Sequence, residues 1–163
     1  MAVACVCFVG KQNEPLSLQV FNSDDELSMQ FAAYAALDIV EEKVQAQESS
    51  SPPYGQTGGA AASLPPPSGD CYLGVICPAL CLSRDYLFYA YVCTTGVKIL
   101  VAIEQRNHYL QHDVRNLFRR LHRLYADTIC NPFLLDTIET PKFLSELDAI
   151  VDFYGKKFEG GGH

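Results

Sequence analysis

Cysteines are the residues of this sequence whose types and spacing come closest to a site for chemistry. Cys5 and Cys7 alternate along an apolar run, so a β-strand would direct both thiols to one face, as metal ligands or as small packed hydrophobic groups. No second pair at zinc-finger spacing accompanies them, and we interpret them as core. Cys71, Cys77 and Cys81 have no histidine near them in sequence. A nucleophilic cysteine that meets a distant histidine only in the fold, and hence a thiol enzyme, stays as a remote alternative.

Histidines are the second group that could carry chemistry. His108 and His112 are four residues apart, which places two potential metal ligands on one face of a helix, but the glutamate of the metalloprotease motif is missing between them. Exposed surface histidines are the better interpretation. The sequence also lacks a glycine-rich phosphate loop and a Gly-x-Ser-x-Gly nucleophile elbow. We therefore predict no catalytic residue, no metal site and no cofactor.

The charge balance narrows the class of partner. The chain has 12 basic and 19 acidic side chains and a formal net charge of -7, so it lacks the positive field that nucleic-acid binding needs. The helix expected at 110–129 nevertheless has a basic face opposite its apolar stripe. This face contains Arg115, Arg119, Arg120 and Arg123 with His122. The default interpretation is that this basic face is simply exposed to solvent. Contact with acidic lipids or an acidic partner is the alternative. We expect protein partners and no nucleic acid.

Cysteine content and the N-terminal sequence indicate the compartment. The seven cysteines lie mostly in apolar runs and their number is odd, which favours free thiols in a reducing environment. The N-terminal apolar run has neither a basic leader nor a small-residue cleavage site, so it does not resemble a signal peptide. No apolar run approaches the roughly 20 residues of a membrane span. We expect a cytoplasmic protein.

Apolar patterns predict the elements that must position any site. β-rich runs indicate strands, and apolar residues three to four apart indicate helices. The expected order is strands 2–9 and 15–21, helix 24–47, strands 71–77, 85–93 and 97–103, helix 110–129, and a last helix capped by Thr140 that ends at Gly155 or within the glycines 160–162. Five strands joined mainly by hairpins make an antiparallel sheet covered by helices, which gives an α+β domain of two or three layers.

One internal segment has the composition of a disordered loop. Residues 48–70 contain five prolines and four glycines and almost no bulky apolar residue. We predict a single domain over residues 1–158, interrupted by this disordered insertion, and a flexible glycine-rich tail over residues 159–163. The insertion costs the domain little stability, because loop-closure entropy grows only logarithmically with length.

The helix expected at 24–47 has more apolar surface than one sheet can cover. The residues of one arc, about 100° wide, are all apolar and face the sheet: Met29, Ala33, Ala36, Leu37, Val40 and Val44. Leu27, Phe31 and Tyr34 lie roughly opposite that arc, and Asp38 lies among them. We call these four residues the outer stripe.

Two glutamates, Glu41 and Glu42, border the outer stripe and add to its acidic character. Aromatic side chains around a carboxylate suit a protein interface, where the apolar groups bury area and the charge selects the partner. We predict that the stripe and both glutamates bind a partner protein. The alternative is that the final helix or the long loop covers the stripe within the same chain.

Several segments together resemble the sedlin family. They are MAVACVCFVGKQNEPL at the N-terminus, LDIVEEK at 37–43, YLG at 72–74, DY at 85–86 followed by YAYV at 89–92, and the stretch from LFR at 117–119 to CNPF at 130–133. The resemblance covers nearly the whole chain outside residues 48–70. The sequence departs from the family pattern in that insertion, in a longer connection at 79–84 and in the glycine-rich tail.

This resemblance implies a longin-like, or profilin-like, fold, with five antiparallel strands, one helix on one face and two on the other. It implies a non-catalytic subunit of the trafficking protein particle (TRAPP) complex, which tethers vesicles between the endoplasmic reticulum and the Golgi. Other TRAPP subunits would be its partners. Nucleotide exchange on a Rab-family GTPase would belong to the whole complex, so that contact is indirect. The aspartate matching Asp38 would lie where the subunit meets its neighbours.

The resemblance also implies a place in the cell. The chain would be cytoplasmic and perinuclear, peripheral to endoplasmic reticulum and Golgi membranes and associated with them only through the complex. A longin-type domain of a coat adaptor or of a SNARE-related protein is the alternative of the same fold. A SNARE would need a long heptad helix and a membrane anchor after this domain, which the sequence does not contain.

Overall fold

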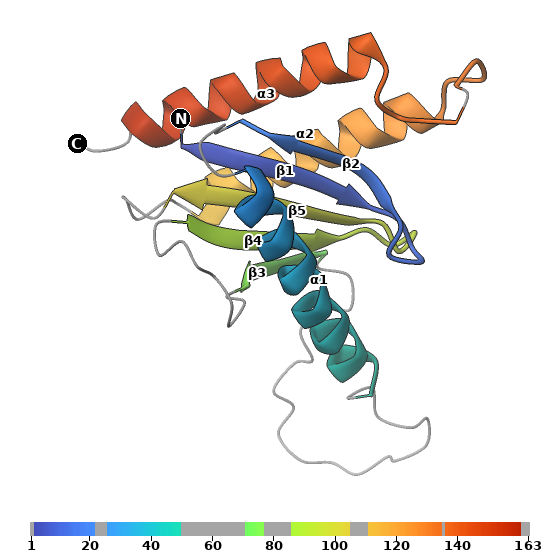
Figure 1. Ribbon diagram of the computed structural model, residues 1–163, viewed down its shortest axis with the longest axis vertical. Coiled ribbons are helices and arrows are strands. Elements are labelled where there is room, and N and C mark those ends of the chain that lie inside the picture. The colour runs from blue at the N-terminus through green and yellow to red at the C-terminus, as the bar shows by residue number, and fades with distance from the viewer. Residues whose placement is uncertain are drawn as a thin grey trace, which may run out of the picture.

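The computed structural model of the protein, shown in Figure 1, describes residues 2–21, 26–49, 71–76, 86–104, 111–134 and 136–160. Its elements follow the order β1 (Val3–Val9), β2 (Pro15–Val20), α1 (Glu26–Ser49), β3 (Tyr72–Ile76), β4 (Tyr86–Val92), β5 (Lys98–Glu104), α2 (Gln111–Ile129) and α3 (Pro141–Gly160). The predicted order of strands and helices is confirmed. None of the helices in this part of the chain combines the length and apolarity that a membrane crossing needs.

The five strands form one antiparallel sheet in the order β2-β1-β5-β4-β3. The two hairpins β1–β2 and β4–β5 lie side by side, so the central pair joins β1 to β5. A short turn joins β4 to β5, and its Gly96 adopts φ +90, a conformation that costs glycine little. The prediction of an α+β domain with a five-stranded antiparallel sheet is confirmed.

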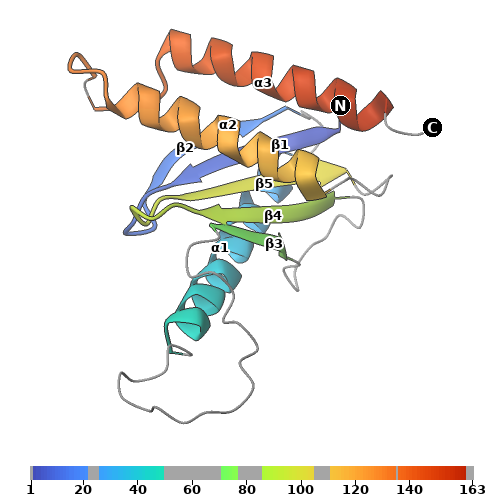
Figure 2. The ribbon, with the colours of Figure 1, turned by 180° about the vertical axis from the view of Figure 1, so that it is seen from behind.

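Helices cover both faces of this sheet. α1 crosses one face, and α2 and α3 lie side by side on the other, as Figures 1 and 2 show from opposite sides. The two cores divide accordingly: Val6, Val101 and Ile103 pack toward α2 and α3, whereas Leu100 and Ala102 pack toward α1. Because both faces are covered, β1 is buried along its whole length. This is the arrangement of layers that the resemblance implied.

Two predicted boundaries differ from the structure at helix ends. α1 continues to Ser49, two residues into the segment expected to be disordered, because no helix-breaking residue occurs before Pro52. Residues 50–70 lie outside the described residues, as does the connection 79–84. α3 passes through the buried Gly155 and ends at Gly160, so the expected tail begins two residues later than predicted and its remainder, 161–163, also lies outside the described residues.

The start of α3 agrees with the capping prediction. The Thr140 hydroxyl oxygen accepts a hydrogen bond of 3.2 Å from the Phe143 N–H, and Pro141 occupies the first turn, where no N–H partner is needed. Phe143 and Leu147 then enter the core beneath α2 and α3. The cap thereby fixes the direction in which α3 leaves the loop and packs along α2.

Candidate protein-binding surface

The inner face of α1 packs on the sheet through the residues expected from the sequence. Met29, Ala33, Ala36, Leu37 and Val40 are buried, and Val44 is half-buried at the edge of the same core. The structure adds Ala32 to this face. The three buried alanines of this face let the helix backbone approach the sheet closely.

The outer stripe is exposed along α1. The exposed fractions of its apolar side chains are 65% for Leu27, 66% for Phe31 and 47% for Tyr34, and Asp38 is also exposed. α3 lies on the opposite face of the sheet, so the alternative that the final helix covers the stripe is wrong. The long loop lies outside the described residues. No cation within ion-pair distance of Asp38 belongs to the described part of the chain.

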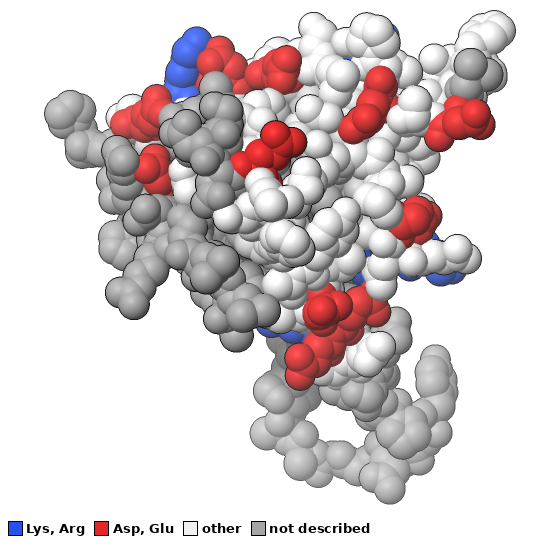
Figure 3. Space-filling model, viewed as in Figure 1, with Lys and Arg blue, Asp and Glu red and all other residues white. Residues whose placement is uncertain are grey.

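Charge divides the outer surface of α1 into two parts. The first turn of α1 carries the exposed Glu26; beyond it, Figure 3 shows uncharged surface and then a cluster of acidic side chains toward the C-terminal half of the helix. Glu42 is exposed and belongs to this acidic part. Apolar anchors therefore sit next to carboxylates on one helix face, which is the composition expected of an interface with a basic or amide-donating partner.

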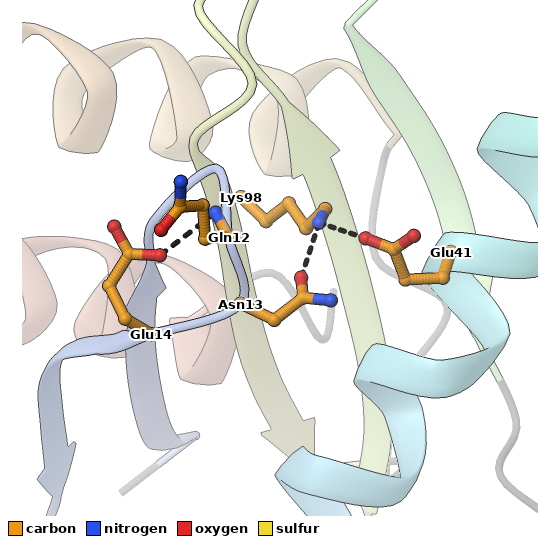
Figure 4. A network of polar contacts seen from close by, with 5 residues as sticks. All are labelled: Gln12, Asn13, Glu14, Glu41 and Lys98. Carbon is orange, nitrogen blue, oxygen red and sulfur yellow. Dashed lines mark hydrogen bonds and ion pairs between the residues drawn. The ribbon is translucent and has the colours of Figure 1, made fainter.

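Glu41 has a different role from its neighbour. The Lys98 ammonium, on β5, donates one hydrogen bond to Glu41 and another, of 2.5 Å, to the side-chain oxygen of Asn13 (Figure 4). Hydrogen bonding to Lys98, and secondarily to Asn13, holds the pKa of the Glu41 carboxyl below its ordinary value. Glu41 thus turns toward the sheet and engages its own chain, whereas Glu42 points to solvent.

Sequence reasoning missed Lys98 and Asn13 as parts of this network. Lys98 is the single charge in the run VKILVAI and is only 4% exposed. A lone lysine in a central strand was the available signal, because a buried charge needs a partner. Asn13 has φ 63 in the β1–β2 turn, and the bond from the Gln12 N–H to the Glu14 carboxylate, 2.8 Å, supports the same turn (Figure 4).

The cysteines of the described strands are core residues. Burial raises the pKa of Cys5, and it raises that of Cys7 and Cys93 to about 12, so these thiols stay protonated at neutral pH and are poor nucleophiles. Cys71 is half-buried and Cys130 is exposed. Cys77 and Cys81 lie outside the described residues. These protonation states oppose a thiol enzyme built on the buried cysteines.

The histidine pair lies only partly within the described residues. His112 is exposed on α2 and hydrogen-bonds to Asn116 at 3.1 Å, whereas His108 lies outside the described residues. His122 packs against the Tyr91 ring. In the part of the chain that the structure describes, no three His, Cys, Asp or Glu side chains converge to form a metal site.

A family model and individual relatives point to the same protein family. The family model described as Sedlin matches residues 8–153. A protein of Bos taurus named trafficking protein particle complex subunit 2-like protein is 32% identical over 134 residues, which are 82% of this chain and 83% of that protein. The protein of that name from Dictyostelium discoideum is 30% identical over 155 residues, which are 91% of this chain and 96% of that protein. The protein from Taeniopygia guttata is 31% identical over 134 residues, with 82% and 83% covered.

Proposed function

This chain belongs to the sedlin family, and from that membership we propose that it is an assembly subunit of a trafficking protein particle complex that docks on a neighbouring subunit through the outer stripe of α1. The relatives that it resembles over most of their length are named as subunits of that complex. The family relationship supports the kind of assembly. The surface chemistry of α1 supports the place of contact.

The exposed stripe is the observation that carries this proposal. α1 already uses its inner face for the sheet, so Leu27, Phe31 and Tyr34 add nothing to the described core and keep large apolar areas in water. Burying one such side chain completely contributes about 1.5–3 kcal/mol, which a partner can gain by covering it. Their spacing along one helix face suits a groove that takes several anchors of a helix at once.

Carboxylates next to the stripe define the other half of the contact. Asp38 lies one turn after Tyr34, and Glu42 lies one turn after Asp38, so their charges extend the apolar face toward the C-terminal end of α1. A partner with arginine, lysine or amide donors beside an apolar groove would match both parts. Glu41 is excluded from the contact surface in this proposal because it is engaged with Lys98.

The proposed membership of the complex also implies a cellular process and a location for this chain. As a subunit, the chain would take part in transport between the endoplasmic reticulum and the Golgi and would support nucleotide exchange on a Rab-family GTPase only through the assembled complex. It would be cytoplasmic and perinuclear, and it would reach the membranes of these organelles through its neighbours. The chain itself would carry no catalytic residue, in keeping with the protonated thiols of its core.

Affinity purification of the tagged full chain from cells tests the docking surface. Phe31→Ala and Asp38→Lys should each remove most of the co-purifying complex subunits, as identified by mass spectrometry. Phe133→Ala is the matched control, because Phe133 is 86% exposed in the connection between α2 and α3 and is not part of the stripe. Full recovery of the same subunits with both α1 variants would refute the proposed contact.

A further inference from the structure

The outer face of α2 carries three arginines that pair with no carboxylate in the part of the chain that the structure describes. This helix contains four of the chain's 12 basic side chains, all of them arginines and none a lysine. Arg119, Arg120 and Arg123 are exposed, and none of them forms an ion pair with a carboxylate of the described residues. Asp127 follows Arg123 by one turn without pairing to it. In a chain with 19 acidic side chains, three neighbouring arginines that form no ion pair within the described residues are a specific feature of this surface.

The two carboxylates of α2 do not neutralise this surface. Asp113 accepts a hydrogen bond of 2.7 Å from the Lys157 ammonium of α3, so its charge is already paired with a lysine at the seam between the helices. Among the described residues, Arg119 has only the side-chain oxygen of Asn116 as a hydrogen-bond partner, at 3.5 Å. The guanidinium groups of Arg119 and Arg123 therefore keep most of their donors available to an external acceptor.

One arginine of α2, Arg120, stacks on aromatic rings of α3. The guanidinium carbon of Arg120 lies 5.5 Å from the centroid of the Phe153 ring and 6.0 Å from that of Tyr154. A guanidinium stacked on a ring keeps its edge donors free, and that edge matches a carboxylate in a bidentate geometry. Phe153 is itself 54% exposed, although most large apolar residues of α3 are buried. An apolar anchor thus lies directly beside the cationic surface.

The side chains of α3 favour an acidic protein segment over an anionic membrane as the partner of these arginines. A flat anionic membrane that reached the arginines would also meet α3, where the carboxylates of Glu146, Asp148 and Asp152 are exposed. It would also meet a chain with a net charge of -7. A narrow acidic segment of a protein can follow α2 and place one apolar side chain on Phe153, so that it covers less of α3 than a flat membrane would. Arginine and an exposed aromatic ring are also the residue types that dominate binding energy at protein interfaces.

We propose that Arg119, Arg120 and Arg123, together with Phe153, bind an acidic segment of a partner protein that carries an aromatic or aliphatic side chain among its carboxylates. This surface lies on the face of the sheet opposite α1, as Figure 2 shows, so both surfaces can be occupied at once. The chain then bridges two partners, one through an apolar and acidic helix and one through a basic helix. This inference uses none of the residues of the outer stripe and holds or fails independently of the contact proposed there.

Fluorescence anisotropy with synthetic peptides tests this surface on the full chain. The probe is a labelled peptide of alternating aspartate and glutamate with one central phenylalanine, and its reference is the same peptide with asparagine and glutamine in place of the acids. The acidic probe should bind and the amide reference should not. The Arg119→Gln, Arg123→Gln double variant should weaken binding by about tenfold or more, because charge-assisted hydrogen bonds are lost. Phe153→Ala should weaken it as well.

The control removes the same amount of charge from the neighbouring helix. Lys142→Gln with Lys156→Gln changes two exposed lysines of α3 and should leave the affinity within about twofold, since rim charges contribute little to affinity. Equal weakening by both double variants, or no binding of the acidic probe, would overturn the proposal. Arginine-dependent binding to phosphatidylserine vesicles without binding to the peptide would also overturn it, in favour of a membrane. Phe31→Ala should leave peptide binding unchanged, which separates this result from that for α1.

Discussion

The ammonium group of Lys98, buried in the central strand β5, is joined to the carboxylate of Glu41 on α1. The pair links the helix that carries the outer stripe to the middle of the sheet. Asn13, from the β1–β2 turn, shares the same ammonium. Three segments that are distant in sequence therefore meet at one cation, which sets how α1 lies across the sheet.

Glu41→Gln should destabilise the domain by about 1–3 kcal/mol, because a nearly buried lysine then loses its charged partner and keeps only amide acceptors. Urea denaturation followed by circular dichroism measures this difference. Glu42→Gln is the matched control: Glu42 is exposed on the next position of α1, and its replacement should change the free energy of unfolding by no more than about 0.5 kcal/mol. Equal effects of the two substitutions would contradict the assigned role of the pair.

The same pair predicts a dependence of stability on pH. The pKa of Glu41 is lowered in the folded chain from an ordinary value of 4.5, mainly by its bond with Lys98. A lowered folded pKa means that the contribution is present above the unfolded pKa and is lost as the pH falls through the folded pKa. The free-energy difference between the native chain and Glu41→Gln should therefore be constant near neutral pH and shrink below about pH 4.5. Denaturation series at several pH values check this, and a difference that grows toward acid would have the wrong sign.

Helical periodicity was sufficient to predict the two faces of α1. Apolar residues three and four apart define an arc directly, and burial of Met29, Ala36 and Val40 agrees with it. The role of Glu41 could not be predicted in this way. A helical wheel gives the direction of Cα–Cβ, but a glutamate at the border of the stripe is long enough to turn back to the sheet, and its partner lies 57 residues away in sequence. Only the strand register brings Lys98 beneath it.

The apolar pattern of the sequence also could not predict which face of the sheet each helix covers. Amphipathic stripes on α2 and α3 show that each helix has one buried face, but not which face of the sheet it covers. The resemblance to the sedlin family supplied that distribution. Contacts between helices, such as Arg120 with the Phe153 ring, depend on the crossing of α2 and α3 and had no local signal.

Substitutions on opposite faces of α1 should separate stability from binding. Ala36 is fully buried against the sheet, so Ala36→Leu should overpack that contact and lower the free energy of unfolding by about 1–3 kcal/mol. Tyr34→Ala on the outer face should change it by no more than about 0.5 kcal/mol, while it weakens recovery of complex subunits. Thermal denaturation and affinity purification of both variants give the two readouts. A large loss of stability from Tyr34→Ala would mean that part of the chain covers the stripe.

Alkylation should distinguish the exposed cysteine from the buried ones. At pH 7.5 iodoacetamide should modify Cys130 in the native chain, because that thiol is exposed at the end of α2. Cys7 and Cys93 should stay unmodified, since burial both blocks the reagent and raises their pKa to about 12, which leaves almost no thiolate. Peptide mapping by mass spectrometry after timed alkylation checks each site, and alkylation in urea is the control that all of these thiols can react. Rapid native modification of Cys7 or Cys93 would show an opened sheet face and would return the thiol-enzyme alternative to consideration.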